Sequence, residues 1–176
     1  MATNDYHFIT VWHIPGTIKE VFTVLFADSV ALKDWWPSVY LDVKILEQGD
    51  ANGIGQKVEL FTKGWLPYTL RWNFVVTENE PPHHVKIVAD GDFVGRGIWT
   101  LEEEGDQVKV TYDWKISAEK GLLKTLSFIM KPIFGANHRW AMGMGEKSLL
   151  LELQRRRAST PEDKAKIPPP PQATFH

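Results

Sequence analysis

Near Leu122 the periodicity of apolar residues changes from that of a long series of strands to that of a helix, and this change restricts the fold more than any other feature. From about Leu122 to Arg157 the apolar period is 3.6 residues, which is typical of an α-helix. Before it, apolar and polar residues alternate in six segments divided by turn-forming residues, at roughly 38–47, 55–63, 67–78, 83–90, 97–104 and 107–116. The pattern predicts a meander of antiparallel strands followed by one long helix.

The first 37 residues predict a strand and two short helices. The alternating segment 6–14 is typical of a strand. Residues 17–27 form one apolar helical face, with Thr17 as the N-cap and Glu20 as its capping-box partner. A second helix, within 31–37, is expected to end at or before Trp36, because the residue that follows is a proline.

The predicted strands are apolar on one face only. In "QVKVTYDWKIS" the residues Val108, Val110, Tyr112, Trp114 and Ile116 share one face, and polar residues occupy the other. An antiparallel sheet of this kind needs a cover on its apolar face, and the C-terminal helix is the only predicted element long enough. The expected fold class is α+β, with a curved, seven-stranded antiparallel sheet wrapped around that helix.

Composition restricts the broad class of protein. A chain of 176 residues with 43% hydrophobic and 24% charged residues is typical of one globular domain. Without a run of 18 apolar residues or an N-terminal apolar segment after basic residues, neither a membrane span nor a signal peptide is expected, which favours the cytoplasm. The absence of cysteine excludes disulfides and thiolate metal sites.

Basic residues gather at the C-terminal end of the chain. Residues 154–176 hold five basic residues against two acidic ones, so the rest of the chain is acidic, which argues against nucleic-acid binding. Residues 158–176 lose both periodicities and contain four consecutive prolines. We therefore expect a domain over 1–157 and a flexible, Pro-rich tail over 158–176; a recognition peptide for a partner's aromatic groove is the alternative.

The long helix carries small and polar residues within its apolar stripe. Projected at 100° per residue, Ile129, Ile133 and Met144 share a face whose middle holds Asn137, Ala141 and Ser148, with His138 and Gly145 at its edge. A glycine inside a helix costs about 1 kcal/mol relative to alanine. Small residues on the apolar face of a helix are expected in two cases: a neighbouring element packs very close to the helix, or a bound molecule fills the space beside it.

The sheet facing this stripe is rich in aromatic residues, which do not readily collapse onto small side chains. The sequence therefore predicts a cavity for a small hydrophobic molecule between sheet and helix. In the alternative, a closed core, Asn137 and Ser148 bond the backbone or each other. The predicted ligand-binding residues are Trp12, Tyr68, Trp72, Trp99, Tyr112, Trp114, Asn137, His138, Ala141, Met144 and Ser148.

Four motifs in this order resemble the START-like, Bet v 1-like (SRPBCC) helix-grip superfamily, and in particular its polyketide cyclase/dehydrase-like proteins. They are "HIPGTIKEVF", "DWWP", "GIWTLEE" and "NHRWAMGMGEKSLLLEL", within residues 1–155. Thr17 departs from the proline that many members carry. The resemblance implies a helix-grip fold with a hydrophobic tunnel that holds lipids, sterols, polyketides or aromatic molecules.

Three function classes remain open from the sequence. The first is a module that binds a small hydrophobic ligand, such as a lipid or a polyketide. The second is a polyketide cyclase/dehydratase-type enzyme, for which His138 is the best acid–base candidate, although no catalytic set can be assembled from spacing. The third is a co-chaperone-like adaptor, which predicts an exposed apolar patch in place of a cavity. The sequence indicates no cofactor, no metal site and no oligomeric state.

Overall fold

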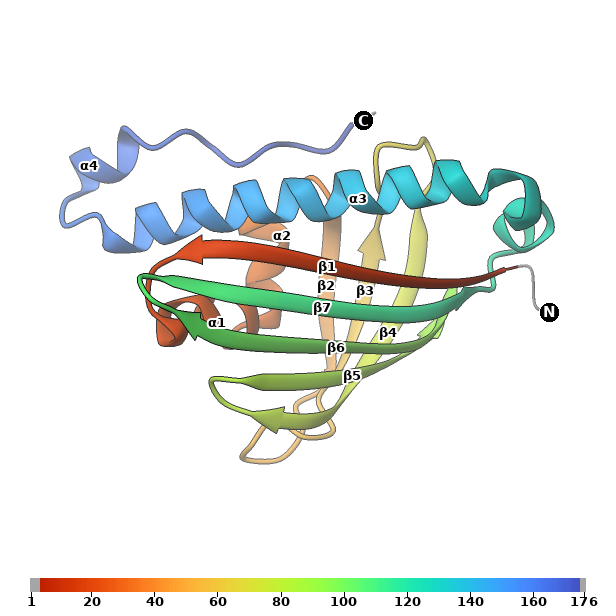
Figure 1. Cartoon of the computed structure of the whole chain (residues 1–176), viewed down its shortest axis with the longest axis horizontal. Helices are drawn as coiled ribbons and strands as arrows, with labels where there is room; N and C mark the ends of the chain where they lie inside the picture. Colours follow the sequence, from red (N-terminus) through yellow and green to blue (C-terminus); the bar gives the residue numbers. More distant parts are fainter. Residues whose placement is uncertain (1–3, 175–176) are drawn as a thin grey trace.

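One curved antiparallel sheet wraps around one long helix (Figure 1). The computed structural model describes residues 4–174, apart from the side chains of residue 122 and residues 126–128. The seven strands lie in the order β1-β7-β6-β5-β4-β3-β2. Their bounds are Asp5–Pro15 (β1), Tyr40–Glu47 (β2), Lys57–Thr62 (β3), Leu70–Glu80 (β4), His84–Gly91 (β5), Phe93–Glu104 (β6) and Gln107–Ala118 (β7).

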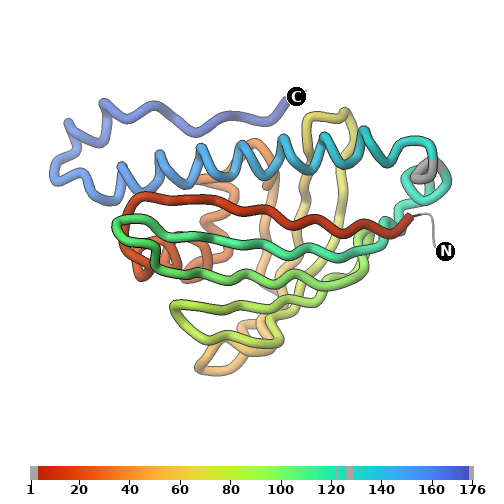
Figure 2. The backbone as a smooth tube through the Cα atoms, in the orientation of Figure 1, coloured from red at the N-terminus to blue at the C-terminus, as the bar shows by residue number. Residues whose placement is uncertain are grey.

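The long helix α3, Gly121–Arg157, crosses the open side of the sheet, as the path of the backbone in Figure 2 makes clear. Two short helices, α1 (Ile18–Phe26) and α2 (Leu32–Trp35), are joined by the 3₁₀ turn Ser29–Ala31 and lie between β1 and β2. The predicted fold class and the two short helices are confirmed. Among the described residues, no helix combines the length and the apolar composition that crossing a membrane requires.

The start of α1 has the geometry that its sequence predicts. The hydroxyl of Thr17 accepts a hydrogen bond from the Glu20 backbone N–H at 3.2 Å. In return the carboxylate of Glu20 accepts from the Thr17 N–H at 2.9 Å. The capping box is confirmed, and α2 ends at Trp35, before the proline, as expected.

The strand β6 begins four residues earlier than the sequence analysis predicts. The stretch "DGDFVG" was expected to divide two strands, but the turn is confined to its first residues, where Gly91 has a φ of +104°. Phe93 already pairs with Ala118 of β7. The longer strand brings the Phe93 side chain to the apolar side of the sheet.

The C-terminal segment beyond α3 turns back along that helix, on the side away from the sheet (Figure 1). It contains a short helix, α4 (Pro161–Ala165), whose N-cap is Thr160. The Arg155 guanidinium donates to the Pro168 carbonyl at 2.9 Å. Residues 158–174, for which the sequence predicts flexibility, thus have a defined course; residues 175–176 of that predicted tail and 1–3 of the predicted domain lie outside the described residues.

Candidate ligand-binding cavity

Two adjoining cavities lie between the sheet and the helices. The first, which we call the helix chamber, has a volume of about 120 Å³ and lies against α3. The second, the turn chamber, has a volume of about 390 Å³ and lies between the C-terminal end of α1, the turn at Ala51–Gly53 and strands β3 to β7. Both are lined mainly by apolar and aromatic side chains, which is the usual composition of a small-molecule site.

Four aromatic residues border both chambers and form a shared wall: Trp36, Tyr40, Trp72 and Tyr112. The rings of Trp36 and Tyr40 meet edge to face, with centroids 5.1 Å apart. The indole N–H of Trp72 donates to the hydroxyl of Thr62 at 3.0 Å, and both residues are buried. This hydrogen bond fixes the orientation of the Trp72 ring at the boundary of the two chambers.

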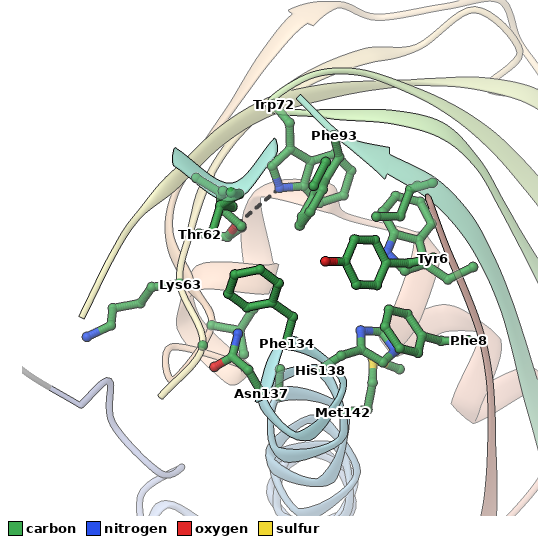
Figure 3. A pocket seen from close by; sticks show the side chains of 18 of the residues that line it. Tyr6, Phe8, Thr62, Lys63, Trp72, Phe93, Phe134, Asn137, His138 and Met142 are labelled. Carbon is green, nitrogen blue, oxygen red and sulfur yellow. Dashed lines mark hydrogen bonds between the residues drawn. The ribbon is translucent and has the colours of Figure 1, made fainter. Parts of the chain in front are cut away.

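Besides Leu123 near the start of α3, the residues of this helix that line the helix chamber follow helical spacing: Phe134, Asn137, His138, Ala141 and Met142. Figure 3 labels Phe134, Asn137, His138 and Met142 around the chamber. The predicted face of the helix is wrong, because Ile129 is 74% exposed and Ile133 is 37% exposed. Apolar residues occur around most of the circumference of α3, so the period alone does not select the side that meets the sheet. The buried side is rotated toward Met142 and Leu149.

Two glycines allow close packing beside the helix chamber. A Cβ atom on Gly145 would lie 2.6 Å from ring atoms of Trp36, so the indole ring rests directly on the helix backbone. A Cβ atom on Gly64 would overlap the side-chain amide of Asn137. Gly145 therefore gives room to a neighbouring side chain, while Ala141, one turn away, faces the chamber.

His138 is neutral and stacked in the wall of the helix chamber. Its ring lies parallel to that of Phe8, with centroids 4.2 Å apart. Burial lowers the pKa of His138 to about 4, and the positive charge of Arg139 acts in the same direction. Its buried Nε2 atom has no hydrogen-bond partner among the described residues. His138 is therefore neither a surface histidine nor one whose hydrogen bonds are satisfied.

Asn137 and Ser148 differ in their hydrogen bonding. The Asn137 side-chain oxygen accepts from the Leu66 backbone N–H at 3.2 Å, which ties the loop between β3 and β4 to α3. The Ser148 hydroxyl is fully buried and has no partner among the described residues. The closed-core alternative predicts backbone or mutual bonds for this pair, and of the two only Asn137 makes such a bond.

Most of the predicted site residues lie together. Trp99 lines the turn chamber and stacks on Tyr112 at 3.9 Å. Trp12, Met144 and Ser148 line neither chamber; Trp12 is 2% exposed and packs against Trp36 and Trp99. The other predicted residues line the helix chamber: Tyr68, Trp72, Tyr112, Trp114, Asn137, His138 and Ala141.

The sequence analysis missed several lining residues. Tyr6 and Phe8 share the parity of the predicted Trp12 along β1, so strand alternation was a signal that could have found them. Phe93 lies in the stretch "DGDFVG", for which the sequence predicts a turn. Lys63 borders the helix chamber, but its side chain extends away from the centre, toward the C-terminal segment (Figure 3). No group of three or more potential metal ligands occurs within the described part of the chain.

The comparisons with known proteins rest on structure. No family model and no curated protein matches this chain. Solved structures do match, among them TTHA0849 from Thermus thermophilus, with 15% identity, a TM-score of 0.68, and 87% of this chain and 100% of that one covered.

Two further structures extend the comparison. The Zhui aromatase/cyclase from Streptomyces sp. R1128 has 19% identity and a TM-score of 0.64, with 88% of this chain and 97% of that one covered. Ara h 8.0201 has 12% identity and a TM-score of 0.51, with 79% and 99% covered. At these identities the likeness establishes the fold.

Proposed function

Since this chain has the helix-grip fold of the START-like and Bet v 1-like superfamily, we propose that it binds a small, mainly apolar ligand with an aromatic part in its two chambers. The observation that carries the proposal is the cavity between sheet and helix. Its two chambers share the wall formed by Trp36, Tyr40, Trp72 and Tyr112, and further aromatic residues line each of them. The turn chamber, at about 390 Å³, falls within the range of about 300–1,000 Å³ typical of ligand sites.

Two ring nitrogens in side chains that line the helix chamber indicate that the ligand also carries polar atoms. The Nε1 atom of Trp36 and the Nε2 atom of His138 are buried without hydrogen-bond partners among the described residues. Leaving a buried polar group unsatisfied costs about 1–3 kcal/mol, and a ligand oxygen or nitrogen would recover this if the ring turned its nitrogen into the chamber. The favoured ligand thus carries a few polar atoms on an otherwise apolar frame.

Binding is tested on untreated, purified protein by native mass spectrometry and by titration with the apolar fluorophore 8-anilinonaphthalene-1-sulfonate. We expect a co-purified ligand or a saturable rise in fluorescence. The variant Ala141→Trp fills the helix chamber and should weaken binding at least tenfold. Gly143→Trp adds the same side chain where a Cβ meets nothing within 4 Å, and serves as the control. Absence of both ligand and titration, or equal effects of the two variants, contradicts the proposal.

A second candidate function, a cyclase/dehydratase-type reaction, is favoured by the unpartnered, neutral imidazole of His138 in an apolar chamber. A neutral imidazole accepts a proton, although burial makes this one a weak base at neutral pH. The variant His138→Ala, assayed with a poly-β-ketone substrate, tests the candidate, and unchanged turnover would remove His138 as the acid–base group. The adaptor alternative predicts an exposed apolar patch in place of the cavity, so the cavity favours the first two.

A further inference from the structure

The loop of residues 63–69, between β3 and β4, forms part of the wall of the helix chamber. Lys63, Gly64 and Tyr68 line that chamber. On its inner side the loop is held by Asn137, which accepts from the Leu66 N–H and packs against the bare backbone of Gly64. Because this loop lies between the chamber and the outside, its outward movement would open the chamber.

The C-terminal segment meets the same loop from the other side. We call residues 167–174 the strap. The Thr174 hydroxyl donates to the carbonyls of Gly64 and Trp65, at 3.4 and 3.2 Å. The Lys63 ammonium donates to the Thr174 carbonyl. No described residue of the strap lines either chamber, so the strap contacts the loop without forming part of the cavity wall.

The composition of the strap suits a stiff connection between two fixed points. Four prolines, at 168–171, favour an extended polyproline conformation that has no internal hydrogen bonds. One end is anchored to α3, where Arg155 donates to the Pro168 carbonyl and also pairs with Glu152 at 3.2 Å. The other end reaches the loop through Thr174. The link depends on few hydrogen bonds, so it opens more readily than the sheet unfolds.

We propose that the strap holds the 63–69 loop against α3 and thereby sets the rate at which ligands enter and leave the helix chamber. The proposal that the strap holds the loop is argued from the contacts of Thr174 and Lys63 alone and does not depend on the proposed binding function. The effect on ligand exchange rests on the proposed binding function, so the two parts need separate measurements.

The holding action is tested by amide hydrogen exchange in a chain that lacks residues 168–176. We expect the amides of residues 63–66, 68 and 69, including that of Leu66, to exchange at least tenfold faster, while those of the Asp50–Gly53 turn keep their rate. The control is Lys164→Ala, an exposed change in α4 that leaves the strap in place. Unchanged exchange of the loop after the deletion overturns the proposal.

A second variant covers the case in which the deletion weakens the whole fold, which faster exchange in β6 and β7 would reveal. Replacing Pro168–Pro171 by a Gly-Ser sequence of equal length keeps Thr174 and removes only the stiffness. Faster exchange confined to residues 63–69 supports the proposal. Exchange equal to that of the unmodified chain contradicts it.

The effect on ligands is tested by stopped-flow binding of 8-anilinonaphthalene-1-sulfonate. The deletion should raise the association and dissociation rates about fivefold each and change the dissociation constant less than twofold, since the strap does not border the bound probe. A higher dissociation constant together with an unchanged association rate would mean that the strap contacts the bound probe. That result would overturn the proposed role of the strap in ligand exchange. If the probe does not bind at all, the proposed function fails, and the exchange experiment still decides the holding action.

Discussion

The indole ring of Trp36 lies flat enough on Gly145 that a Cβ atom there would come within 2.6 Å of its Cε2 and Cη2 atoms. This contact explains why a helix accepts a glycine in its interior. It also places the "DWWP" segment against α3, so that Trp36 borders both chambers. Close packing at Gly145 and open space at Ala141 therefore occur within one turn of the same helix.

The variant Gly145→Ala is expected to destabilise the protein by about 1–3 kcal/mol, because the added methyl group displaces the Trp36 ring. This cost outweighs the gain of about 1 kcal/mol from the better helix propensity of alanine. Urea denaturation measures the difference. The control Gly143→Ala, where a Cβ meets nothing within 4 Å, should stabilise by up to about 1 kcal/mol. Stabilisation by both changes would show that Trp36 does not press on the helix.

The stability of the protein should fall between pH 6.5 and pH 4 through His138. Its pKa is lowered from 6.5 to about 4 by burial, so in this range the unfolded chain takes up a proton that the folded chain does not. Stability from the neutral ring is complete above pH 6.5 and is lost as the pH falls toward 4, by roughly 3 kcal/mol. Denaturation of the unmodified chain and of His138→Gln at several pH values tests this. Parallel pH curves would contradict it.

The variant Thr62→Val should destabilise by about 1–3 kcal/mol, because it leaves the buried N–H of Trp72 without its acceptor. Thr62→Ser keeps the hydroxyl and should retain most of the stability. Thermal or chemical denaturation compares the two variants. A loss in Thr62→Ser equal to that in Thr62→Val would mean that the methyl group contributes as much as the hydrogen bond, and an unchanged stability of Thr62→Val would contradict the prediction.

The ion pair of Glu20 with Arg157 should stabilise the junction of α1 and the end of α3 by no more than about 1 kcal/mol, since both side chains are more than a third exposed. The hydrogen bond from Arg157, followed by that from the Thr17 backbone, lowers the pKa of Glu20 to about 2. The contribution is thus present above pH 4.5 and is lost as the pH falls toward 2. A double-mutant cycle with Glu20→Gln and Arg157→Met measures it; a coupling near zero at pH 7 would contradict the prediction.

The fold could be predicted from the sequence because its determinants are local. Alternation along the strands, the Thr17–Glu20 capping box and the change of period near Leu122 are each visible over short stretches of the sequence. The sheet and the helix then have one apolar face each to bury. The resemblance to the helix-grip superfamily, which rests partly on the same residues, led to the same expectation.

The site could be predicted only in part, because it depends on how distant elements meet. The side of α3 that faces the sheet is fixed by contacts such as that of Trp36 with Gly145, and these are not visible in the period of a helix whose apolar residues are spread around most of its circumference. The division into two chambers depends on the rings of the shared wall. The return of the strap to the 63–69 loop depends on single hydrogen bonds, which leave no pattern in the sequence.

If the two chambers hold the ligand proposed above, the residues that line them differ in whether a substitution changes one chamber or both. Any substitution at Trp36, Tyr40, Trp72 or Tyr112 alters two compartments at once, so tolerance for a longer guest and tolerance for a broader one change together there. Phe134 and Gly53 each border a single compartment. Under the proposed binding function, selectivity is therefore adjusted independently at such peripheral positions, while the four residues of the shared wall restrict ligand size in both chambers at once.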